Sequence, residues 1–60
     1  MMKIWITRDF DKSLKLHFDT PTLFEDETWV SLGEKEIDFT LFSEVTFENS
    51  PQMIELNLVK

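Results

Sequence analysis

The sequence lacks cysteine and tyrosine altogether and contains a single glycine, Gly33. Without cysteine the chain has neither disulfide bonds nor cysteine-ligated zinc, so packing and hydrogen bonds have to stabilise the fold. With one glycine it has no glycine-rich loop of the kind that cradles phosphate groups. No stretch approaches the roughly 18 consecutive apolar residues that suggest a membrane span, and residues 1–8 show no signal-peptide pattern. We therefore expect a cytoplasmic protein that does not associate with membranes.

Residues that carry catalysis are equally scarce, because His17 is the only histidine and no Gly-x-Ser-x-Gly motif or thiol accompanies it. A catalytic base needs a nucleophile or a carboxylate beside it in a pocket. His17 instead lies in a stretch of alternating apolar and polar residues, on the same face as Lys15, which is typical of a solvent-facing position on a strand. We therefore predict that the protein is not an enzyme, and that it has no catalytic residues and no cofactor.

Acidic residues outnumber basic ones by twelve to six, and the resulting net charge of −6 is unevenly distributed. Residues 1–18 carry four basic side chains against two acidic ones, whereas residues 19–60 carry two against ten. Direct binding to nucleic acid is disfavoured, because phosphate contacts need clustered Lys and Arg. The acidic groups at 25–27 and 34–38 lack the glycine-containing spacing of calcium loops, so no metal site is predicted.

The apolar content is what favours a folded domain over a disordered chain. Hydrophobic residues make up 42% of the sequence and include six phenylalanines and two tryptophans. Aromatic side chains bury the most area each, so a core can form in 60 residues without a disulfide or a metal. The length leaves room for one domain, residues 1–60, and at the usual scale per residue its free energy of unfolding should be about 3–9 kcal/mol.

Alternation of apolar and polar residues, punctuated by turn formers, predicts β-strands along most of the chain. The first predicted hairpin pairs Lys3–Arg8 with Ser13–Phe18. Its loop is Phe10–Lys12, because a loop of this length sets Ile6 opposite Leu16 on one face. A loop longer by one residue would set apolar residues against charged ones.

The second predicted hairpin pairs Glu27–Leu32 with Lys35–Phe39. Gly33 and Glu34 form its turn, since glycine suits the first central position of a type II′ turn. The segment 19–26 contains proline and is predicted to be a loop with at most one helical turn.

The third predicted hairpin pairs Val45–Glu48 with Met53–Val59 through the loop Asn49–Gln52. The strand Met53–Val59 has only Glu55 and Asn57 on its polar face, without an interior proline or lysine to protect an exposed edge. If this strand lies at the edge of the sheet, it is a candidate for pairing with a second copy, so a homodimer is one predicted assembly.

These hairpins predict an all-β fold, a small meander of five or six short antiparallel strands that forms a barrel or a sandwich. The alternative is an α+β domain with one short helix in residues 20–28 or 40–46. The apolar residues that fall on one face of each predicted hairpin form the predicted core, which consists of Ile4, Ile6, Leu14, Leu16, Val30, Ile37, Phe39, Val45, Phe47, Ile54 and Leu56.

Two segments resemble a group of small uncharacterised proteins from bacterial and phage genomes. The segment Lys3-Ile4-Trp5-Ile6-Thr7-Arg8-Asp9, followed by Ser13-Leu14 and Pro21, resembles their opening. The segment Phe42-Ser43-Glu44-Val45-Thr46-Phe47-Glu48-Asn49-Ser50-Pro51 resembles their closing part. The resemblance covers about half the chain, implies a recurring compact unit encoded on a phage or mobile element, and brings no known function or site. The chain departs from the group in the first turn, where a glycine is expected at Lys12 or Ser13.

Trp5, His17 and Trp29 are the candidate binding residues, because both tryptophans fall on the less apolar faces of their predicted strands and tryptophan is enriched at interface hot spots. The alternative is that the tryptophans belong to a second small core, or that the loop 19–26 covers them. The predicted function is a small acidic protein-interaction module with a protein partner, which sequence does not identify. The alternative is an acidic inhibitor that imitates nucleic acid and blocks a DNA-binding protein.

Overall fold

The computed structural model describes residues 2–56, which form six short β-strands and no helix. The all-β prediction is therefore confirmed, and neither 20–28 nor 40–46 contains the helix of the α+β alternative. The strands are β1 (Met2–Arg8), β2 (Leu14–His17), β3 (Thr22–Leu23), β4 (Trp29–Val30), β5 (Glu34–Ile37) and β6 (Gln52–Leu56).

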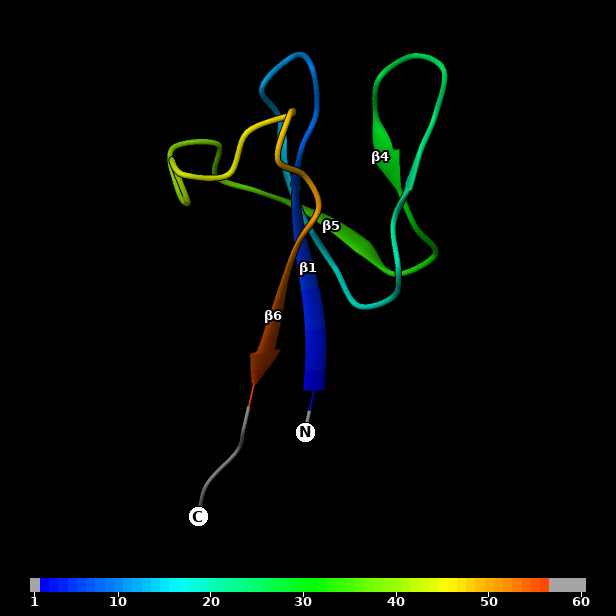
Figure 1. Ribbon diagram of the computed structural model, residues 1–60, viewed down its shortest axis with the longest axis vertical. Helices are drawn as coiled ribbons and strands as arrows, with labels where there is room; N and C mark the ends of the chain where they lie inside the picture. The colour runs from blue at the N-terminus through cyan, green and yellow to red at the C-terminus, as the bar shows by residue number, and fades with distance from the viewer. Residues whose placement is uncertain (1, 57–60) are drawn as a thin grey trace.

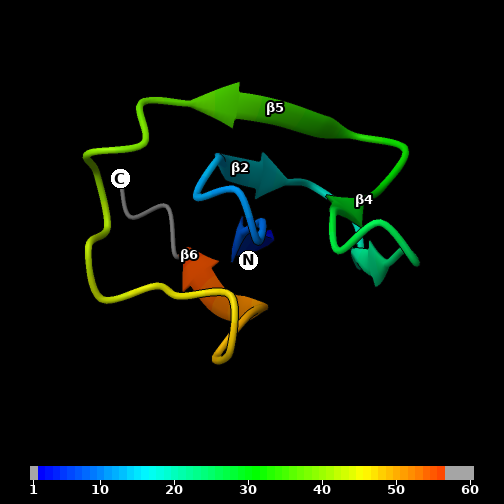
Figure 2. The same ribbon diagram turned by 90° about the horizontal axis from the view of Figure 1, so that it is seen from above.

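Four of the strands form an antiparallel sheet in the order β5-β2-β1-β6, and β3 pairs with β4 in a separate sheet of two strands. The β3–β4 hairpin lies on one side of the larger sheet and the segment 38–51 on the other (Figure 1, Figure 2). The order differs from a meander because β6 returns to pair with β1. Within residues 2–56 the sheet stays open, with β5 and β6 as its edges, so the barrel, one of the two predicted arrangements, does not form.

The first hairpin forms as predicted, with Ile6 opposite Leu16 and Trp5 opposite His17. The amide of Asp9 donates to the carbonyl of Ser13 at 2.8 Å, which closes the three-residue loop 10–12. Lys12 ends this loop with φ at 78°, the left-handed conformation that such loops use before the second strand.

The second predicted hairpin is wrong, because its two strands have other partners. β5 pairs with β2, where Ile37 lies opposite Leu14, and β4 pairs with β3. Gly33 does not have the positive φ that the first position of a type II′ turn requires. Its carbonyl instead accepts the amide of Phe18 at 2.8 Å, and its amide donates to Asp19 at 2.9 Å, so Gly33 links two parts of the chain.

The third predicted hairpin is also wrong. Residues 45–48 are not a strand, and β6 pairs with β1 so that Ile54 lies opposite Ile4. The reason is a local turn: the amide of Thr46 donates to Asn49 at 2.7 Å, and the amide of Asn49 donates back to the Thr46 hydroxyl at 3.1 Å. Such side-chain bonds compete with strand pairing. Residues 57–59 of the predicted strand lie outside the described residues.

One face of the large sheet forms the apolar core. Ile4, Ile6, Leu14 and Val45 are buried. Three partly buried residues pack against the cluster of Ile6, Leu14 and Val45, namely Leu16, Ile37 and Ile54. Val30 and Phe47 are half-buried, and the side chain of Leu56 lies outside the described part. Phe39 is a wrong core prediction, since it is 65% exposed. β5 ends at Ile37, and the alternation that would turn Phe39 inward ends with it.

Candidate functional site

The opposite face of the sheet carries a buried polar network centred on His17. The side chains of His17 and Thr7 are both fully buried. The Thr7 hydroxyl lies 2.7 Å from Nε2 of His17, and the Ser31 hydroxyl lies 2.7 Å from Nδ1. The prediction of a solvent-facing His17 is therefore wrong, because the segment that carries Ser31 covers this face. A neutral imidazole with two hydroxyl partners is fully hydrogen-bonded here, which is what burial of a polar group requires.

Burial lowers the pKa of His17 below its ordinary 6.5, an effect that nearby Lys15 strengthens and nearby Glu34, Asp9 and Asp19 oppose. The unfolded chain therefore takes up this proton at a higher pH than the folded chain does. Stability contributed by neutral His17 is present above pH 6.5 and is lost progressively as the pH falls below that value.

We expect the melting temperature to fall when the pH is lowered from about 7.5 to about 5, and to fall less in a His17→Gln variant. Hydrogen bonds lower the pKa of Asp19 and of other carboxyl groups below their ordinary value of 3.8. These groups therefore change the stability only at a lower pH than His17 does. Thermal unfolding followed by circular dichroism at several pH values measures the difference. An equal drop in both proteins would contradict the assignment to His17.

An ion pair on the same face fastens the β3–β4 hairpin to the sheet. Nζ of Lys15 lies 3.1 Å from the carboxylate of Asp9, whose side chain is only 3% exposed. The other Asp9 oxygen accepts the backbone amide of Trp29 at 2.8 Å, and Lys15 donates to the Trp29 carbonyl at 2.8 Å. Glu34 lies 3.7 Å from Lys15. Asp9 and Lys15 together therefore satisfy both backbone groups of Trp29.

The three predicted binding residues lie on this same side of the molecule. Trp5 and His17 are cross-strand partners, and the hairpin that carries Trp29 is held over their face. Both tryptophans are half-buried, and the indole Nε1 of Trp29 is shielded from solvent without a hydrogen-bond partner among residues 2–56. A fully buried His17 offers no contact area to a partner. Trp5, His17 and Trp29 therefore form a layer between the sheet and the β3–β4 hairpin, and not an open binding surface.

Arg8 organises the segment that covers the apolar face. It ends β1, and all five of its guanidinium N–H groups are engaged, which is the full donor capacity of the side chain. The acceptors are backbone carbonyls at 2.7–3.1 Å, namely those of Lys12, Phe39, Leu41, Phe42 and Val45. The amide of Arg8 also donates to the Ser50 hydroxyl at 2.9 Å. Segments 3–9 and 42–51, which carry the resemblance, therefore meet at Arg8.

The segment held by Arg8 forms one wall of a largely apolar cleft of about 660 Å³, here called the aromatic cleft, in which Phe10, Phe39 and Phe47 are the aromatic lining residues. The rings of Phe10 and Phe47 meet edge to face, with centroids 5.5 Å apart. Phe10 is 63% exposed and Phe39 is 65% exposed. Large apolar side chains gathered around a hollow in this way are typical of binding surfaces.

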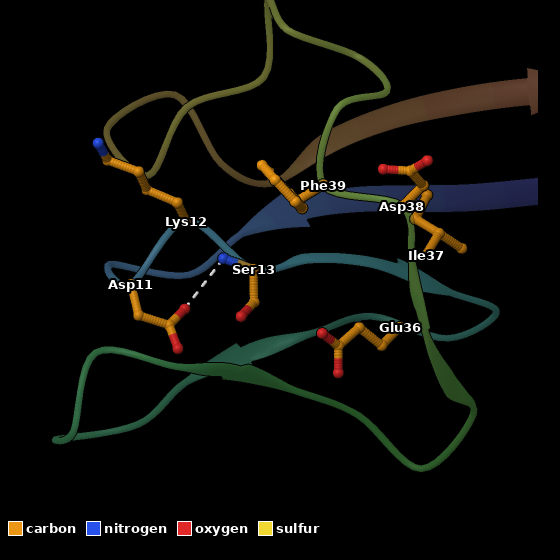
Figure 3. A pocket seen from close by; sticks show the side chains of 7 residues that line it. All are labelled: Asp11, Lys12, Ser13, Glu36, Ile37, Asp38 and Phe39. Atoms are coloured by element: carbon orange, nitrogen blue, oxygen red, sulfur yellow. Dashed lines mark hydrogen bonds between the residues drawn. The ribbon is translucent and has the colours of Figure 1, made fainter.

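A second cleft of about 490 Å³, here called the acidic cleft, adjoins the first and shares Lys12 and Phe39 with it. Figure 3 shows the carboxylates of Asp11 and Glu36 on either side of Ser13, while Lys12 extends away from them. The amide of Ser13 lowers the pKa of Asp11, and the amide of Thr40 likewise lowers that of Asp38. Both carboxyl groups are therefore charged at neutral pH.

No protein-family model, curated protein or solved structure matches this chain. Among residues 2–56, no three or more His, Cys, Asp or Glu side chains are arranged to hold a metal ion. The same residues include no helix that is long and apolar enough to cross a membrane.

The residues around the two clefts were not among the candidates that the sequence suggested. One signal was present: Arg8 continues the series Ile4, Ile6 on the apolar face of β1, where a charged side chain is costly unless its donors are satisfied. A charged residue in such a series indicates a partner segment above it. The phenylalanines gave no comparable signal, since the same alternation suits a core position and an exposed one.

Proposed function

We propose that this chain is a non-enzymatic protein-interaction module that holds a segment of another protein in the aromatic cleft. The observation that carries the proposal is the exposure of Phe10 and Phe39 around one hollow. Full burial of a phenylalanine side chain is worth about 1.5–3 kcal/mol, so two exposed rings are a substantial source of binding free energy. The half-buried Phe47 supports Phe10 edge to face and gives the cleft a firm wall.

The environment of the titratable groups supports a binding role over a catalytic one. His17 and Thr7 are the pair that most resembles a base and a nucleophile, but both side chains are fully buried. Their hydrogen bonds tie strands and hairpin together, which is a structural task. The aromatic cleft instead offers apolar area with a polar rim, which suits an apolar anchor from a partner.

Selection from a phage-displayed library of random peptides tests the proposal. Peptides should be enriched on the native protein, and Phe39→Ala should weaken their binding at least about tenfold, which corresponds to about 1.4 kcal/mol. Phe39 is exposed, so its replacement should leave the melting temperature nearly unchanged. Fluorescence anisotropy with labelled peptides measures the affinity.

The matched control is Phe24→Ala, which removes a phenylalanine that is 55% exposed, against 65% for Phe39, and that lies outside the aromatic cleft at the end of the β3–β4 hairpin. This variant should bind the enriched peptides like the native protein. Failure to enrich any peptide, or equal losses in the two variants, would overturn the proposed site.

A further inference from the structure

We infer that the segment bound in the aromatic cleft places a lysine or arginine beside its apolar anchor, with the cationic group in the acidic cleft. This inference rests on the proposed function and adds the chemistry of the partner. Phe39 and Lys12 belong to the walls of both clefts, so the two hollows lie side by side and are here together called the groove. An extended peptide that seats an apolar side chain against Phe39 therefore has the acidic cleft next to it.

Charge favours a cation in that position. The acidic cleft is lined by three carboxylates, those of Asp11, Glu36 and Asp38, against the single cation Lys12. Lys12 points away from the carboxylates of Asp11 and Glu36, as Figure 3 shows, and among residues 2–56 it forms no ion pair. The lining of the hollow therefore carries a net negative charge.

The charges of the aromatic cleft do not reverse this preference. Arg8 lines that cleft, but its N–H donors are all directed at backbone carbonyls, so it has none left for an acidic partner. Asp9 also lines it and is neutralised by Lys15 at 3.1 Å. The net charge of −6 attracts a basic segment from a distance and repels an acidic one.

Polar and apolar parts of the groove have separate roles in this arrangement. Phe10, Phe39 and Phe47 supply the area that an apolar anchor buries, and this contact sets most of the affinity. The carboxylates act at an exposed rim, where each pair contributes less but discriminates by sign. Binding is therefore expected to depend on salt only through the cationic residue.

The test uses the same random-peptide library and a pair of double variants. Enriched peptides should carry Lys or Arg next to an aromatic or aliphatic residue. Glu36→Gln combined with Asp38→Asn should weaken their binding about three- to tenfold at low salt, with a much smaller loss near 1 M salt, where the Debye length is only about 3 Å. Asparagine keeps the oxygen through which Asp38 accepts the amide and hydroxyl of Thr40.

The control is Glu25→Gln combined with Asp26→Asn. It removes the same charges from a turn of the same kind, since Asp26 accepts the amide and hydroxyl of Thr28 as Asp38 does those of Thr40. Its effect on peptide binding should stay below about twofold, the scale of an exposed charge that does not touch the peptide.

The remaining outcomes distinguish failure of this inference from failure of the proposed function. Peptides that depend on Phe39 but lack a cationic residue, or that bind the Glu36/Asp38 variant as tightly as the native protein, would overturn this inference and leave the aromatic cleft as a binding site. Equal losses in the two double variants would point to the general negative charge, as expected of a nucleic-acid mimic, and would also overturn it. Peptides unaffected by Phe39→Ala would overturn the proposed function itself.

Discussion

Replacing Arg8 with alanine should lower the free energy of unfolding by about 3 kcal/mol, because hydrogen bonds to a charged group are each worth about 1.5–3 kcal/mol before solvent exposure is taken into account. Four of the five carbonyls that Arg8 reaches lie in exposed positions where water replaces the lost donor. The carbonyl of Val45 is different, since its bond at 2.7 Å is partly buried and Val45 itself belongs to the core. Its desolvated oxygen accounts for much of the expected loss.

The loss should be concentrated in the covering segment. Urea denaturation measures the global effect, and hydrogen exchange should show faster exchange at the amides of Leu41 and Val45, whose turns depend on the Arg8 network. Arg8→Lys is the informative control, because lysine keeps the charge and the apolar stem but cannot direct donors to five carbonyls. It should recover only a small part of the loss, and full recovery would contradict a role based on the guanidinium geometry.

The same variant bears on the binding site. Arg8 binds the backbone carbonyl of Phe39 directly, and Phe47 follows Val45, whose carbonyl Arg8 also binds. A loosened segment should therefore weaken peptide binding even in molecules that remain folded. A peptide that binds the Arg8→Ala variant with native affinity would show that the aromatic cleft does not need this fixed segment.

The features of the fold that the sequence predicts correctly are those that depend on residues close together in the chain. The first hairpin is fixed by one loop length and by the matching of Ile6 with Leu16, and both are local properties. β5 was predicted close to its true position, but its partner was not. The alternation of apolar residues allows Ile37 to pair on an apolar face with either Val30 or Leu14. Only the arrangement of the whole sheet selects Leu14 as its partner.

The site was less predictable for a related reason. Residues 38–50 form neither strand nor helix, although 45–48 alternate between apolar and polar residues, and their path is set by Arg8 and by local bonds of Asp38 and Asn49. An apolar residue in such a segment can turn inward, as Val45 does, or outward, as Phe39 does. Likewise, the alternation of Thr7, Asp9, Lys15 and His17 looks like a solvated face until a second layer is known to cover it.

The ion pair that holds the β3–β4 hairpin over this face is the source of the other large expected loss of stability. Asp9→Ala should lower the free energy of unfolding by about 3–5 kcal/mol, because it leaves the largely buried Lys15 ammonium without its closest acidic partner. Lys15 is 13% exposed and retains the Trp29 carbonyl and the more distant Glu34, which cannot replace a carboxylate at 3.1 Å. Lys15→Met should be similarly costly, since it leaves the Asp9 carboxylate uncompensated. Losses of this size approach the total stability expected for 60 residues, so the measurements need a stabilising salt such as sulfate.

The double variant Asp9→Ala with Lys15→Met decides whether the two residues act as a pair. Removing both leaves no buried charge, so the combined loss should be smaller than the sum of the single losses by about 1–3 kcal/mol. Part of the loss should remain, because the amide of Trp29 has lost its Asp9 acceptor and the carbonyl has lost Lys15. Tryptophan fluorescence reports on this directly, since the hairpin holds Trp29 against the sheet through these two bonds. Strictly additive losses would mean that Asp9 and Lys15 stabilise the hairpin separately, each through its own bond to Trp29, and not as an ion pair.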